Sequence, residues 1–557
     1  MFFIKSIYLL VVLFIYETHC INYAPVVTTR NGQVRGIIKT LDDGTELYVY
    51  DGIPYAEPPI GNLRFRKPVP IGNWSGVYDA VKYRQSCIQP DKLEPDNNIP
   101  EESIKSEDCL FLTVWSPLPK TCGTKRPVLY WIYGGGFETG TIFSIVNDVR
   151  YVAAMGDVIV VTVNYRLGPW GFLYAGTDDA AGNMGLYDQL EGMRWVKKNI
   201  EFFGGDPNLV TIFGESAGGM SVGAHVVSPL GAGLFRRAIL QSGAPNSYLG
   251  SESREKSYNK TLYLARNLNC STESGRAIVD CLRLKTADQI LNISKTARKD
   301  SKSFEPIFGE DLMPVQALDA LQKGQFNQDI DLMYGTVSQE GALFVESLFP
   351  NVFDPSIPKP KINVVAAKQY IQFLYMVFKE PYGGEVADFY TRGLADTDYD
   401  RLRQAVGYGF GDYNMACPTV VFGREFALHS QGNRVYAFRV THPPTIPVFP
   451  NCKGWMGVCH GDDVLLLFGF PIRLRGITFT ESDYQISRDM IQAWAEFART
   501  GSPSKMGSAN WSEAIDRQSD SPYTKYMDLN PNNYSMVSDY YKESCEGLWL
   551  KLWNVKK

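Results

Sequence analysis

Short runs of β-branched and aromatic residues alternate along this chain with segments whose apolar residues have helical spacing. Strands are predicted at 128–133, 158–163, 209–213, 238–241, 331–334 and 435–440. Helices are predicted at 183–200, 216–227, 482–500 and near the C-terminus, and residues 250–325 and 355–410 are helix-rich. This alternation favours an α/β fold with a mostly parallel central sheet, helices on both faces and helical insertions. Since the 557 residues contain no repeat and no long linker, they predict one large unit rather than several domains.

The first twenty residues have the layout of a secretory signal peptide. Lys5 supplies a positive charge, residues 7–16 form an apolar core, and Thr18 and Cys20 occupy the −3 and −1 positions of a cleavage site. The core is too short to cross a bilayer as a helix. We therefore expect residues 1–20 to be removed, which leaves residues 21–557 as a single secreted, extracellular domain without a membrane span.

The charge of the chain argues against some classes of partner. The net charge is −5 at pH 7, and the basic residues form neither a tail nor a cluster. Nucleic acid and anionic membranes are therefore not expected partners. No cofactor and no metal is predicted, and the sequence leaves the oligomeric state open.

Cysteines and glycosylation sequons agree with export. After removal of Cys20, nine cysteines remain, and an odd number requires at least one free or intermolecular thiol. Six Asn-x-Ser/Thr sequons are present, but Asn269 is doubtful because its middle residue is Cys270. The expected glycan acceptors are Asn73, Asn259, Asn292, Asn510 and Asn533.

The strand predicted at 209–213 leads directly into a Gly-x-Ser-x-Gly pattern centred on Ser216. Glycines on both sides allow a sharp turn from strand to helix, which exposes the hydroxyl at a helix N-terminus where negative charge is stabilised. The pattern occurs again around Ser221, but that residue lies more than one turn into the predicted helix. Ser216 is therefore the predicted nucleophile, and Ser221 is predicted to be structural.

A serine hydroxyl needs an adjacent base, and the chain offers few histidines. His19 belongs to the leader, His225 lies on the predicted helix after Ser216, and His429 follows a helical stretch. His460 lies in a glycine-flanked loop, whereas His442 precedes two prolines. Because loops on a rigid scaffold often carry catalytic groups, the residues favour His460 over His442.

Two further loops follow predicted strands. The strand at 331–334 leads into a loop that carries Glu340. In serine hydrolases with a strand-turn-helix nucleophile, the acid lies between the serine and the histidine along the chain, and Glu340 lies between Ser216 and His460. Glu340 considered alone would be interpreted as a solvated loop residue. Three glycines at 134–136 follow the strand at 128–133, and without side chains their N–H groups can approach a developing oxyanion.

Longer stretches resemble the type-B carboxylesterase/cholinesterase family from about residue 26 to about residue 553. They are EDCLFLTVW (107–115), WIYGGGF (131–137), NYRLG (164–168), FFGGDP (202–207), GESAGGMSVG (214–223) and RRAILQSG (236–243). The resemblance implies an α/β-hydrolase fold whose helical insertions cap an active-site gorge. It also implies a serine hydrolase that cleaves small carboxylic esters through an acyl-enzyme.

The resemblance assigns roles to residues of this chain. It implies Ser216 as nucleophile, His460 as general base and acid, and Glu340 as the acid that orients the histidine. The oxyanion hole would consist of the N–H groups of Gly135, Gly136 and Ala217. Without other information, the base is expected to titrate near the ordinary histidine value of about 6.5.

The family's disulfides map onto Cys87–Cys109, Cys270–Cys281 and Cys417–Cys545. Three cysteines are then left over, namely Cys122, Cys452 and Cys459. Cys452 and Cys459 form a pair with a short loop in one interpretation. In the other, Cys459 is a buried free thiol beside the histidine.

Departures from cholinesterases favour a general carboxylesterase. Residues 88–108 contain no aromatic residue that would hold a quaternary ammonium. Asp300 and Lys302 occur near the expected acyl-pocket phenylalanines, Tyr248 and Leu249 replace a tryptophan, and Glu138 adds an acid beside the glycines.

Two alternatives remain open. One is a cholinesterase whose ammonium site is rebuilt from other aromatic residues. The other is a catalytically silent, neuroligin-like adhesion protein, although such proteins typically lack the nucleophile and have a membrane segment.

Overall fold

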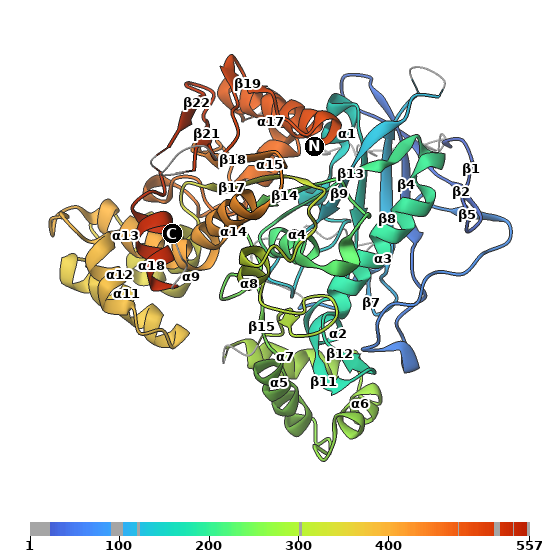
Figure 1. The fold of residues 1–557 in the computed structure, drawn as a ribbon, viewed down its shortest axis with the longest axis horizontal. Helices are drawn as coiled ribbons and strands as arrows, with labels where there is room; N and C mark the ends of the chain where they lie inside the picture. The colour runs from blue at the N-terminus through green and yellow to red at the C-terminus, as the bar shows by residue number, and fades with distance from the viewer. Residues whose placement is uncertain are drawn as a thin grey trace, which may run out of the picture.

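The computed structural model describes residues 23–90, 104–119, 123–299, 303–476, 478–516, 524–538 and 540–553. The predicted leader, residues 1–20, and Cys122 lie outside these residues. The main element of the described part is an eleven-stranded sheet with the order β22-β21-β18-β17-β14-β13-β9-β10-β8-β4-β3 (Figure 1). Its strands are β3 (Ile37–Thr40), β4 (Glu46–Pro54), β8 (Phe111–Pro117), β9 (Arg126–Ile132), β10 (Ile159–Val163), β13 (Gly205–Glu215), β14 (Arg237–Gln241), β17 (Asp331–Val337), β18 (Val435–Val440), β21 (Tyr526–Leu529) and β22 (Ser535–Val537).

The predicted mostly parallel sheet is confirmed. The strands from β10 through β9, β13, β14, β17 and β18 to β21 pair in parallel. The outer strands β8, β4 and β3 at one end and β22 at the other are antiparallel. β10 is buried along its whole length, as expected for a parallel strand with helices on both faces. β13 starts at Gly205, earlier than predicted, because its first residue pairs with β9 before an irregularity in the ladder.

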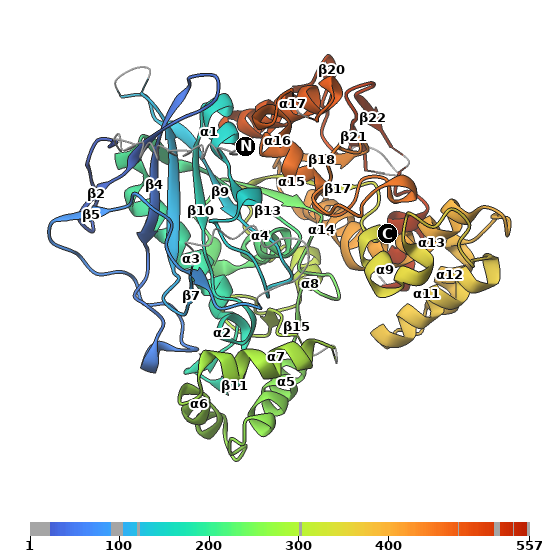
Figure 2. The ribbon, with the colours of Figure 1, turned by 180° about the vertical axis from the view of Figure 1, so that it is seen from behind.

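Helices cover both faces of the sheet (Figures 1 and 2). α3 (Met184–Asn199), α4 (Ala217–Val227) and α14 (Cys417–His429) pack on one face, and α1 (Arg150–Gly156) and α17 (Glu481–Thr500) on the other. The predicted helices at 183–200, 216–227 and 482–500 are therefore confirmed within one residue at each end. This arrangement agrees with the expected α/β-hydrolase fold.

Two helical insertions form separate lobes at the bottom and left of Figure 1. The first contains α5 (Arg254–Asn267), α6 (Gly275–Arg283) and α7 (Ala287–Lys299), whereas α8 (Ala317–Gln322) packs against α14 and α4. The second contains α11 (Val364–Phe378), α12 (Gly383–Tyr390) and α13 (Tyr399–Gly411). The C-terminal helix is mostly a π-helix, Ser544–Trp549, followed by the short α18 (Leu550–Leu552).

Four disulfides join cysteines of the described residues. Cys87–Cys109, Cys270–Cys281 and Cys417–Cys545 are the pairs that the resemblance implies. The fourth joins Cys452 to Cys459. The interpretation of Cys459 as a free thiol is therefore wrong.

Two other expectations concern the glycan acceptors and the absence of a membrane span. The side chains of the predicted glycan acceptors Asn73, Asn259, Asn292, Asn510 and Asn533 are exposed, and glycosylation there stays a prediction. None of the described helices has the length and apolar character needed to cross a membrane.

A buried ion pair fastens the connection after β10 to α3. Asp188 accepts hydrogen bonds from the Arg166 backbone N–H at 3.0 Å and from its guanidinium at 2.8 and 2.7 Å. Their side chains are 0% and 3% exposed. Burial raises the pKa of Asp188, and the guanidinium opposes that shift.

Asp188→Ala should lower the free energy of unfolding by about 3–5 kcal/mol, because it leaves the Arg166 charge buried without its partner. Chemical denaturation followed by tryptophan fluorescence measures the change. Asp280→Ala removes the exposed partner of Arg276 and serves as the control, with an expected midpoint close to wild type. Equal midpoints for the two variants would contradict the importance of the buried pair.

Candidate active site

Ser216 lies at a strained turn between β13 and α4, as predicted. Its backbone has φ 57° and ψ −125°, which turns the chain directly from the strand into the helix. Glycine is required at positions 214 and 218, on both sides of Ser216, because other backbone atoms approach these residues closely. A Cβ on Gly214 would lie 2.5 Å from the carbonyl carbon of Gly218, and one on Gly218 would lie 2.0 Å from the Ile132 oxygen.

The structure assigns Ser221 and His225 to the packing of α4. Ser221 Oγ donates to the Ala217 carbonyl at 2.9 Å and accepts from Gln189 Nε2 at 3.1 Å. His225 Nε2 lies 2.9 Å from Gln189 Oε1, and burial lowers the pKa of His225 to about 3. Because these groups bond locally inside the protein, the prediction that Ser221 is structural agrees with its geometry.

The loops after β17 and β18 bring Glu340 and His460 together. His460 Nδ1 lies 2.7 Å from Glu340 Oε2, and Glu340 Oε1 accepts the Val337 N–H at 3.0 Å. An isolated parallel bridge pairs Gln339 with Cys459, the residues immediately before them. The Glu340 and His460 side chains are both buried, at 2% and 8% exposed. The acid and base predicted from the sequence therefore form a direct contact.

Glu215, the residue before Ser216, contacts the other nitrogen of the same imidazole. His460 Nε2 lies 3.2 Å from Glu215 Oε1. Burial lowers the pKa of His460, but the charges of Glu215 and Glu340 outweigh this effect and raise the pKa from 6.5 to about 9. The expectation of an unperturbed value near 6.5 is therefore wrong, because it ignored the second carboxylate.

Two more buried carboxylates follow His460 in the sequence. Asp463 accepts from Gln241 Nε2 at 2.7 Å, and burial raises its pKa to about 6. Asp462 accepts the Cys459 N–H at 2.8 Å and the Val448 N–H at 2.9 Å, and burial raises its pKa to about 7. Sequence reasoning missed both, although two adjacent acids in His-Gly-Asp-Asp at the end of a catalytic-type loop were a visible signal.

The glycine-rich turn after β9 lies against the serine. A Cβ on Gly134 would lie 2.9 Å from Ser216 Cβ. Gly135 and Gly136 have φ 104° and 63°, which turns their backbone into conformations that glycine favours. Ala217 is the first residue of α4. Within the described residues, the N–H groups of Gly135, Gly136 and Ala217 donate no hydrogen bond, so they are available to an oxyanion.

The alternative base His442 belongs to a different cluster. Its Nε2 lies 2.9 Å from Asp483 Oδ1, at the N-terminus of α17. Hydrogen bonds from His442, Thr445 and Thr480 outweigh the burial of Asp483 and hold its pKa below the ordinary value. His442 therefore contacts Asp483, which forms the capping box of α17 with Thr480, rather than Glu340.

Aromatic residues extend from the imidazole into the second insertion. The Phe344 ring, on α9 (Ala342–Leu348), lies 5.4 Å from the His460 ring and stacks on Phe410 at 5.1 Å. Phe410 contacts Phe378, which contacts Tyr248 at 5.3 Å. Tyr248, noted in the sequence, thus lies in this aromatic series, whereas Asp300 and Lys302 lie outside the described residues.

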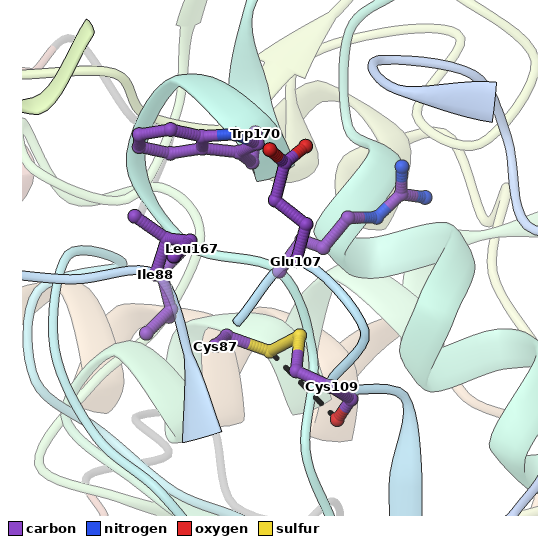
Figure 3. A pocket seen from close by; sticks show the side chains of 7 residues that line it. Cys87, Ile88, Glu107, Cys109, Leu167 and Trp170 are labelled. Atoms are coloured by element: carbon purple, nitrogen blue, oxygen red, sulfur yellow. Dashed lines mark hydrogen bonds between the residues drawn. A yellow bond between two sulfur atoms is a disulfide. The ribbon is translucent and has the colours of Figure 1, made fainter. Parts of the chain in front are cut away.

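A small cavity beside the Cys87–Cys109 disulfide is separate from these groups (Figure 3). Trp170 and Leu167 lie on one side of it and Glu107 on another. Its lining includes neither Ser216 nor His460.

Two groups of potential metal ligands occur among the described residues. One comprises Asp412, Cys417 and Cys545, and the other comprises Cys452, Cys459 and Asp462. In each group both sulfurs belong to a disulfide, and only a thiolate is an effective metal ligand. These groups therefore give no support to a metal site.

Residues 23–548 match the model of the carboxylesterase family. The chain belongs to this family. A cholinesterase of Mus musculus is 34% identical over 543 residues, covering 94% of this chain and 86% of that protein. An acetylcholinesterase of Leptinotarsa decemlineata is 36% identical over 515 residues, covering 86% and 79%. One of Bungarus fasciatus is 33% identical over 494 residues, covering 86% and 78%. The protein is therefore a carboxylic ester hydrolase at the level of its family.

The contacts of His460 predict the pH dependence of hydrolysis. If neutral His460 is the base, kcat/KM for an uncharged ester should rise with pH through an ionisation well above 6.5, because Glu215 and Glu340 stabilise the imidazolium. Glu215→Gln should shift the pKa of that ionisation toward 6.5, because it removes the carboxylate that faces His460 Nε2.

The pH profile of kcat/KM tests this expectation directly. Glu201→Gln is the matched control, since Glu201 precedes the opposite end of β13 and pairs with Lys125 at 3.2 Å. An unchanged profile in Glu215→Gln would show that Glu215 does not set the pKa of His460.

Proposed function

We propose that this protein is a secreted serine esterase in which Ser216 is the nucleophile, His460 the general base and Glu340 the residue that orients it. The observation that carries this proposal is the 2.7 Å contact between His460 Nδ1 and Glu340 beside the strained turn of Ser216. The contact fixes the tautomer with Nδ1–H, so that Nε2 carries the lone pair when the ring is neutral.

Catalysis would proceed in two steps. Ser216 Oγ attacks the ester carbonyl while its proton passes to His460 Nε2, and that proton then goes to the leaving alkoxide. The N–H groups of Gly135, Gly136 and Ala217 stabilise the oxyanion of the tetrahedral intermediate. Water, activated in turn by His460, hydrolyses the acyl-enzyme and releases the acid.

We propose that carboxylic esters of neutral alcohols are the preferred substrates. The loop between Cys87 and Cys109 has no aromatic residue in its sequence, so it offers no cation–π contact to an ammonium group. Secretion is supported by the leader-like sequence of residues 1–20 and by the four disulfides, which persist in oxidising compartments.

A choline ester is the second candidate substrate. It is favoured by the similarity to cholinesterases and by one observation of the structure. A Cβ on Gly461 would lie 3.9 Å from Glu215 Oε1 and 4.0 Å from the Phe449 ring. An aromatic ring and a carboxylate therefore flank the same glycine near His460. This is the type of pair that attracts a quaternary ammonium. Nothing in the described residues favours the adhesion alternative.

Ser216→Ala should lower kcat by several orders of magnitude, whereas Ser221→Ala should stay within about tenfold of wild type. The first change removes the nucleophile, and the second removes only hydrogen bonds within and beside α4. An organophosphate should label Ser216 alone, as mass spectrometry of the peptides can determine. An adduct on Ser221, or full activity of Ser216→Ala, would disprove the assignment.

Esters matched in acyl group but differing in alcohol test the substrate class. Acetyl and butyryl esters of a neutral alcohol should equal or exceed the corresponding choline esters in kcat/KM, because a desolvated cation gains about 0.5–2 kcal/mol only where an aromatic face receives it. Measurements at low and high salt separate that contact from attraction by charge alone, which salt screens.

A choline preference that survives high salt would contradict the neutral-alcohol proposal. Phe449→Leu would then identify the receiving ring, since it keeps the apolar volume and removes the π face. A choline preference that vanishes with salt would instead assign the effect to the carboxylates around His460.

A further inference from the structure

His460 is carried by a loop whose backbone depends on glycine. Gly454 and Gly457 both have φ 62°, and Gly461, the residue after His460, has φ 89°. Glycine populates these conformations readily but loses the most conformational freedom when it is fixed. A loop with three such residues is therefore costly to hold in one geometry, unless other contacts restrain it.

Two restraints act on this loop beside His460. The Cys452–Cys459 disulfide closes its two ends, and the second of these cysteines is the residue before His460. On the other side, the Asp462 carboxylate accepts the Cys459 N–H and the Val448 N–H at 2.8 and 2.9 Å. Asp462 Oδ2 also lies 3.5 Å from Cys452 Sγ, so the carboxylate lies directly beside the disulfide.

We propose that the Cys452–Cys459 disulfide and Asp462 form a clasp that positions His460 for catalysis. His460 is held between Cys459, fixed by the clasp, and Gly461, the N-cap of the following helix Asp462–Leu467. The Cys459 backbone also pairs with Gln339, next to Glu340, so the clasp transmits its restraint to the acid as well as to the base. This inference rests on the proposed role of His460 and names positioning residues for it.

The clasp acts on the contacts that His460 makes. Glu340 faces Nδ1 at 2.7 Å and Glu215 faces Nε2 at 3.2 Å, while Asp463 and Asp462 lie close enough to affect the imidazole by charge. Opening the clasp allows the imidazole to drift from both partners. The base is then misplaced for Ser216, and its imidazolium loses the fixed carboxylates that stabilise it.

Cys452→Ala/Cys459→Ala should reduce kcat for an uncharged ester by between about tenfold and a hundredfold, as misplacement of a reacting group by about 1 Å does. KM should change little, since neither cysteine is placed to bind the ester. The ionisation in the pH profile of kcat/KM should move toward 6.5. Titration with an organophosphate normalises kcat to the folded, competent sites.

Cys270→Ala/Cys281→Ala is the matched control, because it removes a disulfide that joins the segment after α5 to α6, away from the loop that carries His460. Its kcat and pH profile should equal those of wild type. An unchanged kcat and profile in the Cys452/Cys459 variant would overturn the proposal. An equal loss in both variants would overturn it too, because the effect would then be general destabilisation.

Reduction of the folded wild-type protein provides a second measurement that needs no refolding. Dithiothreitol supplies two electrons and two protons, so its own thiols close to a disulfide while Cys452–Cys459 opens to two thiols. Activity is assayed first, and labelling with iodoacetamide then counts free Cys459 by mass spectrometry.

The loss of kcat should follow the labelled fraction of Cys459, and full activity at complete labelling would overturn the clasp. Ser216→Ala in the same assay keeps the two proposals distinguishable. If Ser216→Ala were active, the proposed function itself would be wrong. If it were inactive while opening the clasp had no effect, only the clasp would fail.

Discussion

The contact between His460 Nδ1 and Glu340 is the interaction on which the proposed site depends, and the sheet is what makes it possible. The two residues are 120 positions apart and follow β17 and β18, which are adjacent and parallel. Parallel strands end at the same edge of a sheet, where ligands and reacting groups of α/β folds gather. The strained turn of Ser216 ends β13 at that same edge, so the fold supplies the convergence and the loops supply the chemistry.

The charge balance of the site has a cost as well as a use. Glu215, Glu340 and Asp463 surround one buried imidazole, and together they stabilise its protonated form. That arrangement lowers the fraction of neutral His460 near pH 7 in the free enzyme, yet in the proposed mechanism it stabilises the imidazolium that forms when Ser216 attacks. Under the proposed roles, Glu215 therefore leaves less neutral His460 available near pH 7 and in return stabilises the positive charge that develops in the transition state.

Local patterns predicted the parallel strands except β21, the Ser216 turn and the glycine turn at 134–136, because each depends on neighbours in the sequence. Ser216, Glu340 and His460 could be singled out, but only the resemblance to a family joined them, since their contacts cross more than a hundred residues. The antiparallel strands β3, β4 and β8 were not predicted, because no helical pattern separates them. The partners of Glu215 and Asp462 were also inaccessible, because side-chain contacts across loops leave no periodic signal.

The disulfide at Cys459 adds a covalent restraint to a loop that packing already holds in part, since Trp455, Met456 and Val458 are buried. The backbone around His460 needs glycines to complete its turns, and glycines increase the entropy that must be lost to order it. A disulfide that closes a short loop lowers that entropy before the loop folds. The bond between Cys452 and Cys459 lies at the residue before His460, the proposed base, where small displacements matter most for proton transfer. Its location therefore argues for a role in geometry at the site rather than in global stability alone, which the three other disulfides can provide elsewhere in the chain.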